Sequence, residues 1–401
     1  MQKKRVLVVM NTMVCGGIEK SCLAFLAALP SDRLDVTLLL VHKTGDLLDQ
    51  VPAWIQVREF PLHPADRREM QIGRRAMLRD ALRQGRLLRV CRTLLRRAYC
   101  MACVPEPVWR CLELQAMLAR AGEYETGYDC AIAYADAPIC VAIVSERIRA
   151  KMKLAWFHTE YPVTIVRQEH YRQFYRKFDR LFAASEALAA KLNARMPDLP
   201  QPLEYFSYVI EPADYARKAR CGSGFTDGFQ GLRLLSVGRL SEQKGFDLAI
   251  AVHARLIREG YPIRWYVVGG GHGEDSLREA IRSENVQDSF ILLGQHTNPY
   301  PFFAQCNIYV QSSRYEGYCL TVAEARSFAK PIVCTDFAGA REQIVDGQTG
   351  LIVPCAVDAL YQAVKNLLDH PELGQLFSQN LACQNADTSD AVRRLLDLID
   401  A

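Results

Sequence analysis

Residues 232–245 read LRLLSVGRLSEQKG, and this stretch decides how the second half of the chain folds. Four of its first six residues are apolar, and the stretch is typical of a strand in a parallel sheet. Gly238 ends the run, and two cations, Arg239 and Lys244, precede a helical pattern over 245–260. A strand that leads through a short loop into a helix is one half of a parallel strand–helix–strand unit.

The same order opens the chain. The run RVLVVM at 5–10 leads to a glycine pair, a helical stretch at 18–29 and a second apolar run at 36–41. Further strand-like runs recur in both halves, at 130–134, 153–157, 180–184, 264–268, 290–293, 308–311 and 331–335. A strand–helix rhythm that restarts in mid-chain predicts an α/β protein with two doubly wound, Rossmann-like domains.

The boundary between these domains falls near 211–230, which is rich in Gly, Pro and charge. We therefore predict a first domain over 1–210, with an insertion at about 63–120, and a second domain over 211–385. The last residues, 386–401, form a helix that could cross back onto the first domain.

Composition narrows the class of protein. The chain has 401 residues, of which 50% are apolar and 23% charged, with a net charge of +4. These values are ordinary for a soluble protein and exclude a disordered or collagen-like chain. No apolar run approaches the ~18–20 residues of a membrane-spanning helix, and the first run is too short for a signal peptide. We expect a cytoplasmic protein, and peripheral attachment to the inner face of the cell membrane stays open as an alternative.

The positive charge is concentrated in one segment. Residues 66–99 hold eleven arginines against three acids, a net charge of +8, which leaves −4 for the rest of the chain. Its leucines recur at helical spacing, so it reads as one or two basic amphipathic helices, which favour anionic membrane surfaces. The alternative is a solvated helical insertion. Aromatic residues that would stack on bases are sparse in the segment, which argues against nucleic acid.

Fourteen cysteines are scattered along the chain, many of them in apolar runs, as reduced core thiols are. Cys100 and Cys103 have the spacing of half a zinc site, with Cys91 and Cys111 nearby. No second Cys-x-x-Cys exists and the local pattern is helical, so we favour plain helix faces and predict no metal site.

Ligands of open α/β sheets bind where strands end, and three places follow predicted strands. The first is Gly16-Gly17, which lets a ligand approach the backbone at the start of a helix, although a plain tight turn has the same pattern. The second is the pair Arg239 and Lys244. Two fixed cations at a strand end suit a diphosphate, and they would stabilise charge on a departing phosphate.

The third place follows the run at 308–311. Glu316 lies in a loop there, and Glu324 lies seven residues later in the next helix. The amides of residues 319–321 would form the N-terminus of that helix, where phosphate binds well. Two carboxylates beside such a site suit hydrogen bonds to sugar hydroxyls.

From residue 232 to residue 354 these motifs resemble the retaining glycosyltransferases of family 4, also called glycosyl transferases group 1, which have the GT-B fold. The resemblance rests on several motifs in the family's order: VGRLSEQKGF (237–246), VGGG (268–271), NPYP (298–301), the Glu316–Glu324 spacing and GQTGLIVP (347–354). The first half matches more loosely, at Gly16-Gly17 and at Trp156-Phe157-His158.

The resemblance implies an enzyme that moves a hexosyl or N-acetylhexosaminyl group from a nucleotide sugar, the UDP form being favoured, with retention of configuration. It implies no cofactor and no metal, and the chain has no Asp-x-Asp. The implied candidate catalytic residues are Glu316, Arg239, Lys244 and His158. Glu316 would contact the donor sugar, the two cations would hold the diphosphate, and His158 would face the sugar.

The same resemblance implies the donor-binding positions. Glu324 would bind the ribose hydroxyls, and Gly17 would approach the phosphate or the acceptor from the first domain. The remaining positions are Gly16, Gly238, Gly270, Gly317, Cys319, Leu320 and Thr321. The family often has Phe-Gly where this chain has Tyr318-Cys319, so a larger residue constrains the loop near the sugar.

The stretch 336–343 (DFAGAREQ) resembles a subgroup common in bacterial surface-polysaccharide synthesis, such as capsule or exopolysaccharide. The acceptor would then be a lipid-linked glycan, with segment 66–99 docked on anionic lipid. Two alternatives stay open. The same fold could glycosylate a soluble small molecule or a sugar phosphate, or the chain could be a catalytically silent binding or scaffold protein.

Overall fold

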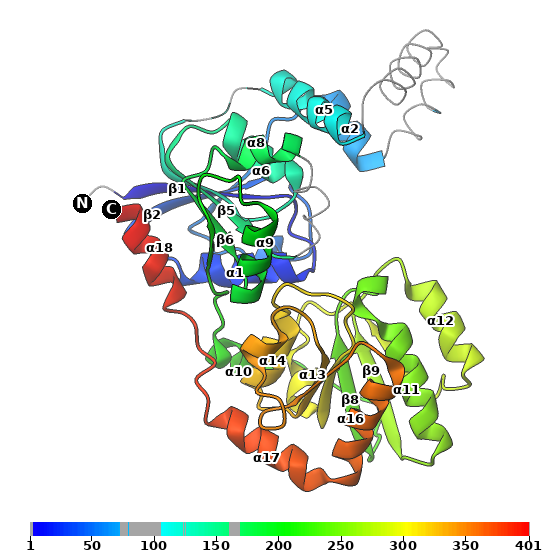
Figure 1. The fold of residues 1–401 in the computed structure, drawn as a ribbon. Helices are drawn as coiled ribbons and strands as arrows, with labels where there is room; N and C mark the ends of the chain where they lie inside the picture. The colour runs from blue at the N-terminus through cyan, green and yellow to red at the C-terminus, as the bar shows by residue number, and fades with distance from the viewer. Residues whose placement is uncertain are drawn as a thin grey trace.

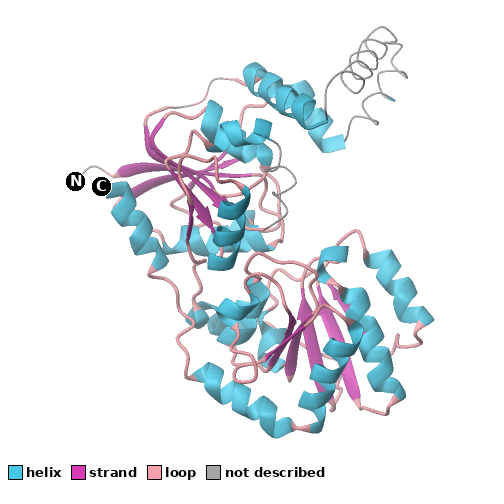
Figure 2. Cartoon of the chain, viewed as in Figure 1, coloured by secondary structure: helices cyan, strands magenta, loops and turns pink. Residues whose placement is uncertain are grey.

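A computed structural model of the protein describes residues 3–72, 79, 106–122, 124, 126–159 and 169–400. Over these residues the strands form two separate sheets, and every strand pair is parallel. Helices pack on the faces of each sheet (Figures 1 and 2). Parallel strands require such crossover helices, which explains why the apolar runs in the sequence are continuous rather than alternating.

The first sheet has seven strands among the described residues, in the order β3-β2-β1-β4-β5-β6-β7. Their bounds are β1 (Lys4–Met10), β2 (Leu34–Leu40), β3 (Gln56–Glu59), β4 (Tyr128–Ala133), β5 (Ala150–Phe157), β6 (Arg180–Ala183) and β7 (Leu203–Tyr205). The order reverses at β1, which pairs with β2 on one side and β4 on the other.

The second sheet has six strands in the described part of the chain, in the order β10-β9-β8-β11-β12-β13. Their bounds are β8 (Leu232–Val237), β9 (Ile263–Val268), β10 (Phe290–Gly294), β11 (Ile308–Gln311), β12 (Ile332–Thr335) and β13 (Leu351–Val353). Here the order reverses at β8, between β9 and β11. Ligands of such sheets bind beside the strand ends at these two reversal points.

We call the part built on the first sheet the first domain and the part built on the second sheet the second domain. The helices of the first domain are α1 (Gly17–Ala28), η1 (Leu48–Gln50), α2 (Pro64–Ile72), α5 (Glu106–Arg120), α6 (Pro138–Glu146), α8 (Glu169–Tyr175) and α9 (Glu186–Arg195). From residue 212 onward they are α10 (Pro212–Ala219), η2 (Glu242–Lys244), α11 (Phe246–Arg258), α12 (Glu274–Ser283), α13 (Tyr300–Gln305), α14 (Leu320–Ser327), α15 (Ala340–Gln343), α16 (Val357–Asp369), α17 (Pro371–Ala382) and α18 (Ala391–Asp400).

The last helix, α18, returns to the first domain (Figure 1). Its buried residues Val392, Leu395 and Ile399 join the same apolar core as the strands of the first sheet. Arg394 of this helix donates to Glu204 of β7 at 2.7 Å. The chain therefore crosses between the domains twice. Its C-terminal helix, α18, forms part of the apolar core of the first domain.

The two domains touch on two sides of the strand ends. On one side Gln295 of the second domain donates to Asp46 of the first at 3.2 Å, and the Cys15 thiol lies 3.7 Å from the His296 carbonyl. On the other side Ser185 of the first domain donates to the Gly317 carbonyl at 3.0 Å. The candidate residues from both domains lie between these contacts.

The structure confirms the predicted class, two α/β domains with parallel, Rossmann-like sheets. The Arg-rich segment 66–99 lies outside the described residues except for 66–72 and 79. At its start, Asp66 pairs with Arg120 of α5 at 2.6 Å, which joins α2 to α5. Cys100 and Cys103 also lie outside the described residues.

Candidate functional site

The loop after β8 carries the two predicted cations. It turns at Gly245, whose φ of 63° lies in the left-handed region. A Cβ on Gly245 would lie 2.1 Å from the Ser312 carbonyl oxygen, so only glycine lets this loop pack against the end of β11. The Ser312 hydroxyl adds a bond to the Lys244 carbonyl at 2.9 Å. The loops that follow two neighbouring strands are thereby joined.

Lys244 and Glu316 form a buried ion pair across this junction. Lys244 Nζ lies 2.5 Å from Glu316 Oε1, and the side chains are only 15% and 7% exposed. Burial opposes the charge on Lys244, but the Glu316 carboxylate outweighs it and holds the pKa of Lys244 above its ordinary value. The ion pair therefore keeps a fixed cation at the end of β8.

A set of polar side chains supports the Glu316 carboxylate. The Ser313 hydroxyl donates to Oε1 at 2.7 Å, and Gln243 Nε2 lies 3.4 Å from Oε2. Ser313 in turn accepts from the Gln311 amide at 2.7 Å, and Gln311 accepts from the Thr321 hydroxyl at 3.0 Å. Gln311 and Ser313 were not among the predicted site residues, although two serines directly after a strand were a visible signal.

The helix α14 begins beside this ion pair. Its N-cap residue, Cys319, has a φ of 72°, and no side chain caps the helix. The amides of Leu320 and Thr321 thus lie at an uncapped helix N-terminus, which favours an anion. Burial raises the pKa of the Cys319 thiol to about 12, so this thiol stays protonated near neutral pH.

Glu324 lies one turn further along α14 and is 3% exposed. Its Oε1 accepts from the Tyr300 hydroxyl at 3.2 Å, whereas its Oε2 is buried without a hydrogen-bond partner among the described residues. Burial raises the pKa of this carboxyl, and the nearby cations Lys20 and Lys218 offset part of the rise. A buried carboxylate oxygen without a partner is costly, so its place is suited to a ligand that donates a hydrogen bond.

The first domain contributes Gly16 at the N-terminus of α1. A Cβ on Gly16 would lie 2.3 Å from Glu19 Oε2 and 3.7 Å from Arg239 Nη2. Arg239 therefore reaches from the second domain to the start of α1, and a side chain at position 16 would require the Glu19 carboxylate to move. Gly17 is different, since it is exposed and a Cβ there would meet no atom within 4 Å.

His158 follows β5 and is buried. Its Nδ1 lies 2.6 Å from the Tyr208 hydroxyl, and its Nε2 bonds to the Tyr134 carbonyl. Because a carbonyl only accepts, Nε2 carries the proton and Nδ1 accepts from Tyr208. Burial also lowers the pKa of His158, which favours this neutral ring. A hydrogen bond between a ring nitrogen and a ligand would require one of these two bonds to break.

The predicted glycines mark close backbone approaches. A Cβ on Gly317 would lie 2.0 Å from the His158 carbonyl oxygen, so the loop after Glu316 rests directly on the first domain. A Cβ on Gly238 would lie 3.1 Å from the Lys244 side chain, which passes over it. A Cβ on Gly270 would lie 3.2 Å from Gln295 Oε1. The structure thus brings Gly16, Arg239, Lys244, Glu316 and the α14 N-terminus to one region.

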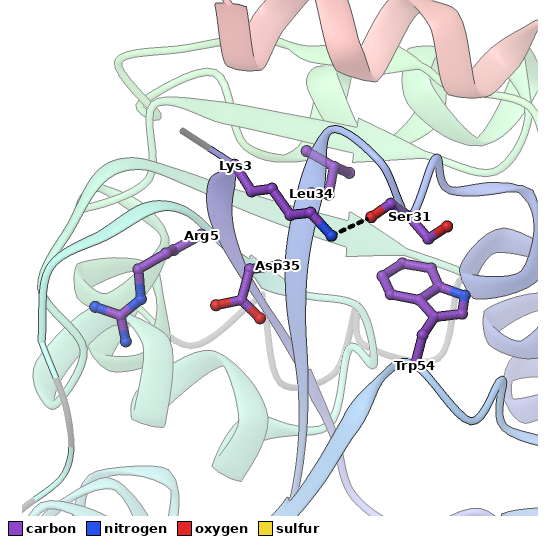
Figure 3. Close-up of a pocket in the computed structure, with 6 residues that line it drawn as sticks. All are labelled: Lys3, Arg5, Ser31, Leu34, Asp35 and Trp54. Atoms are coloured by element: carbon purple, nitrogen blue, oxygen red, sulfur yellow. Dashed lines mark hydrogen bonds between the residues drawn. The ribbon is translucent and has the colours of Figure 1, made fainter. Parts of the chain in front are cut away.

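A separate pocket opens at the opposite, amino-terminal ends of β1 and β2 (Figure 3). It is lined by Lys3, Arg5, Ser31, Leu34, Asp35 and Trp54. Lys3 donates to the Ser31 carbonyl at 2.7 Å and Arg5 to the carbonyls of Thr126 and Gly127, so backbone oxygens already engage both cations. None of the predicted site residues lines this pocket.

In the described part of the chain, no three His, Cys, Asp or Glu side chains lie together in a way that could hold a metal ion. In the same residues, no helix is long and apolar enough to cross a membrane.

Residues 230–382 match the family model "Glycosyl transferases group 1". Over 68% of this chain and 76% of the relative's length, the sequence is 25% identical to the N-acetylgalactosamine-N,N'-diacetylbacillosaminyl-diphospho-undecaprenol 4-alpha-N-acetylgalactosaminyltransferase of Campylobacter jejuni. It is 26% identical to the capsular polysaccharide biosynthesis glycosyltransferase CapM of Staphylococcus aureus, over 36% of this chain and 38% of that protein.

Among solved structures, the chain is similar to Anabaena Alr3699/HepE in complex with UDP. The TM-score is 0.66 at 15% sequence identity, and the match covers 99% of both chains. This likeness concerns the fold, and it covers both domains.

Proposed function

Because residues 230–382 carry the features of a group 1 glycosyl transferase, we propose that this protein is a retaining glycosyltransferase that uses a nucleotide-sugar donor. The observation that carries the proposal is the buried Glu324 carboxylate, whose Oε2 has no partner among the described residues. It lies beside the Lys244–Glu316 ion pair and an uncapped helix N-terminus, at the reversal point of the second sheet. Together these features offer a hydrogen-bond acceptor for hydroxyl groups next to a site that suits phosphate.

In this proposal each end of the donor has its own partner. Ribose hydroxyls donate to Glu324, which gives the free Oε2 the hydrogen bond that it lacks. The diphosphate lies between Arg239 and Lys244 and accepts from the amides of Leu320 and Thr321. UDP is the favoured nucleotide, since a UDP complex is known for the structurally similar Alr3699/HepE.

The reaction breaks the bond between the anomeric carbon and the diphosphate oxygen. Negative charge grows on the leaving diphosphate, so Arg239, Lys244 and the α14 amides stabilise the transition state more than the ground state. The acceptor hydroxyl forms the new bond on the face that the diphosphate leaves, and its proton passes to a phosphate oxygen. This front-face course retains the anomeric configuration.

Glu316 is proposed to contact the donor sugar near the reacting carbon. Its Oε1 already binds Lys244 and Ser313, which suits it to hold the cation and orient the sugar rather than to attack carbon. Glycosidases that form a covalent intermediate place two carboxyl groups on opposite sides of the bond that breaks. Here both carboxylates belong to one loop and the helix after it.

His158 and the glycine pair are proposed to complete the site from the first domain. The His158 carbonyl supports Gly317, and its ring would face the sugar after releasing Tyr208 or Tyr134. Gly16 and Gly17 expose the N-terminus of α1 to a phosphate or to the acceptor.

The proposed acceptor is a lipid-linked glycan of a surface polysaccharide. The name of the Campylobacter relative describes a diphospho-undecaprenol acceptor, and the name of the Staphylococcus relative describes capsule synthesis. The Arg-rich segment 66–99 would then bind anionic lipid, at roughly 1 kcal/mol per suitably placed basic residue.

Salt-sensitive binding to anionic liposomes that is lost when these arginines are neutralised would support membrane binding by segment 66–99. Unchanged binding would argue against it.

The test is a donor and acceptor panel. The purified protein is mixed with UDP, GDP, ADP and dTDP sugars, with a lipid-diphosphate-linked sugar or a soluble sugar as acceptor, in EDTA or in magnesium. We expect nucleotide release with one donor class and the lipid-linked acceptor, equal in EDTA, and a product that keeps the donor's anomeric configuration by NMR. Transfer to soluble sugars alone would favour the small-molecule alternative, and no turnover with any donor would favour a silent binding protein.

A further inference from the structure

The helix α9 of the first domain is capped by side chains from both domains. Its own N-cap residue, Ser185, accepts from the Leu188 amide at 3.1 Å. Glu342, on α15 of the second domain, accepts from the Glu186 amide at 3.1 Å and from the Ala187 amide at 2.8 Å. Each of the first three amides of α9 therefore has a side-chain acceptor, and two of the three come from the other domain.

This arrangement is electrostatically favourable. The N-terminus of a helix carries partial positive charge, and the Glu342 carboxylate binds it through both oxygens. Charge-assisted bonds of this kind are stronger than neutral ones. α9 lies on the side of the first domain that faces α14 (Figure 1). Glu342 thus ties the second domain to one defined point of the first.

The same short helix also holds the loop that carries Glu316. Gln343, the residue after Glu342, is buried and donates to the Tyr318 carbonyl and, at 3.4 Å, to the Cys319 carbonyl. Gly339, just before α15, packs so closely that a Cβ there would lie 2.7 Å from the Gly317 carbonyl oxygen. Glu342 of α15 therefore binds α9, and the next residue, Gln343, binds the 316–319 loop.

A second, direct connection joins α9 to this loop. The Ser185 hydroxyl that caps Leu188 also donates to the Gly317 carbonyl at 3.0 Å. The N-terminus of α9 thus reaches the 316–319 loop by two routes, through Ser185 and through Glu342 with Gln343.

We propose that Glu342 is a positioning residue, which sets the place of the 316–319 loop relative to the first domain by sharing the cap of α9. A shift of the first domain would pull on Glu342 and Ser185, and both transmit it to the loop beside Glu316 and the start of α14. The arrangement of the domains is in this way coupled to the donor site. The inference deepens the proposed function and rests on it for the identity of that site.

Hydrogen exchange of the full chain, measured by mass spectrometry without ligand, tests the link independently of any activity. The variants are Glu342→Ala and Glu342→Gln, which keeps one acceptor oxygen. The control is Glu372→Gln, an exposed acid in the first turn of α17 whose neighbour is His370. In Glu342→Ala we expect about tenfold faster exchange in peptides that cover 185–188 and 316–321, since charged hydrogen bonds are lost. The Gln variant should lie between, and α11 and α12 should not change.

Other patterns would overturn the proposal. Faster exchange at 185–188 with an unchanged 316–321 peptide would show a cap without coupling. Faster exchange throughout the second domain would show a general structural role. If Glu342→Ala fails to fold, Glu342→Gln alone decides, and an unchanged 316–321 peptide beside faster exchange at 185–188 would again contradict the proposal.

UDP serves as the probe in a second arm. In the wild type it should slow exchange at 316–327, and calorimetry should show several-fold weaker UDP binding to Glu342→Ala. Equal UDP affinity in both proteins would contradict the coupling. Absence of UDP protection in the wild type would count against the proposed function, while the ligand-free comparison still decides whether the link exists.

Discussion

Glu316 and Glu324 lie seven residues apart and are both buried, yet their surroundings differ. The Glu316 carboxylate has Lys244, Ser313 and Gln243 around it. The Glu324 carboxylate has one donor, the Tyr300 hydroxyl, and its Oε2 has no partner among the described residues. The first carboxylate is satisfied by the protein, whereas the second is incomplete.

The two buried carboxylates therefore have opposite effects on the stability of the free protein. Glu316 stabilises its own surroundings, because removing either member of a buried ion pair leaves the other uncompensated. Glu324 costs stability in the free protein, since an unpaired buried oxygen has lost water and gained nothing. Such locally unfavourable groups are expected at functional sites.

The largest effect should come from breaking the ion pair between Lys244 and Glu316. Lys244→Met leaves the Glu316 carboxylate buried without its cation and removes a diphosphate ligand. We expect about 3 kcal/mol less stability in urea unfolding and a transfer rate that falls by about 10³-fold. The double variant Lys244→Met/Glu316→Gln should regain much of the stability but not the activity. A double variant as unstable as the single one would contradict the ion-pair account.

Glu324 should show the opposite combination, in which its loss weakens nucleotide binding but does not lower stability. Glu324→Gln should weaken UDP binding by about tenfold or more, because hydrogen bonds to a charged acceptor are lost. Glu316→Gln should change UDP affinity little, since Glu316 is proposed to face the sugar rather than the nucleotide. Isothermal calorimetry on both variants measures this, and equal effects would erase the distinction between the two carboxylates.

The pH dependence of the free energy of unfolding tests the account of Glu324 further. Burial holds the pKa of Glu324 above its unfolded value, so the native state binds this proton more tightly. The contribution of Glu324 to the free energy of unfolding is therefore most favourable at low pH. It falls as the pH rises through the unfolded pKa, about 4.3, to the native pKa.

Glu324→Gln removes that dependence. The variant should be more stable than the wild type at pH 8, by an amount on the order of 1 kcal/mol, and the gap should close as the pH falls below about 4. Urea unfolding of both proteins at several pH values checks it. A gap that widens toward low pH would mean that Glu324 is stabilised as a carboxylate.

The smallest effect concerns Cys319, which lies between the two carboxylates. Its left-handed backbone is costly for a residue with a Cβ, so Cys319→Gly should stabilise the protein by up to about 1 kcal/mol. Thermal unfolding measures this. A clear loss of stability would show that the contact of its thiol with Thr321, at 3.3 Å, outweighs the strain.

Much of the fold was predictable because the signals are local. Continuous apolar runs marked the buried parallel strands, and the restart of the rhythm marked two sheets. The spacing of Glu316 and Glu324 and the cations after β8 were visible in the same way. The hydrogen-bonded state of each carboxylate was not predictable, because the partners Tyr300, Lys20 and Lys244 are brought there only by the folded chain.

Two first-domain residues show the same limit. His158 was predicted to face a sugar, but Tyr208, fifty residues later, occupies one of its ring nitrogens. Gly16 and Gly17 look alike in sequence, yet only Gly16 is crowded by Glu19 and approached by Arg239. Such differences depend on how distant elements meet rather than on local propensity.

The most direct test of the central claim pairs Glu324 with the ribose hydroxyls. Calorimetry would compare UDP with 2',3'-dideoxy-UDP, on the wild type and on Glu324→Gln, in EDTA. If the free Oε2 receives a ribose hydroxyl, the wild type should bind dideoxy-UDP about tenfold or more weakly than UDP, and the variant should hardly distinguish the two. Equal binding of both nucleotides to the wild type would contradict the account.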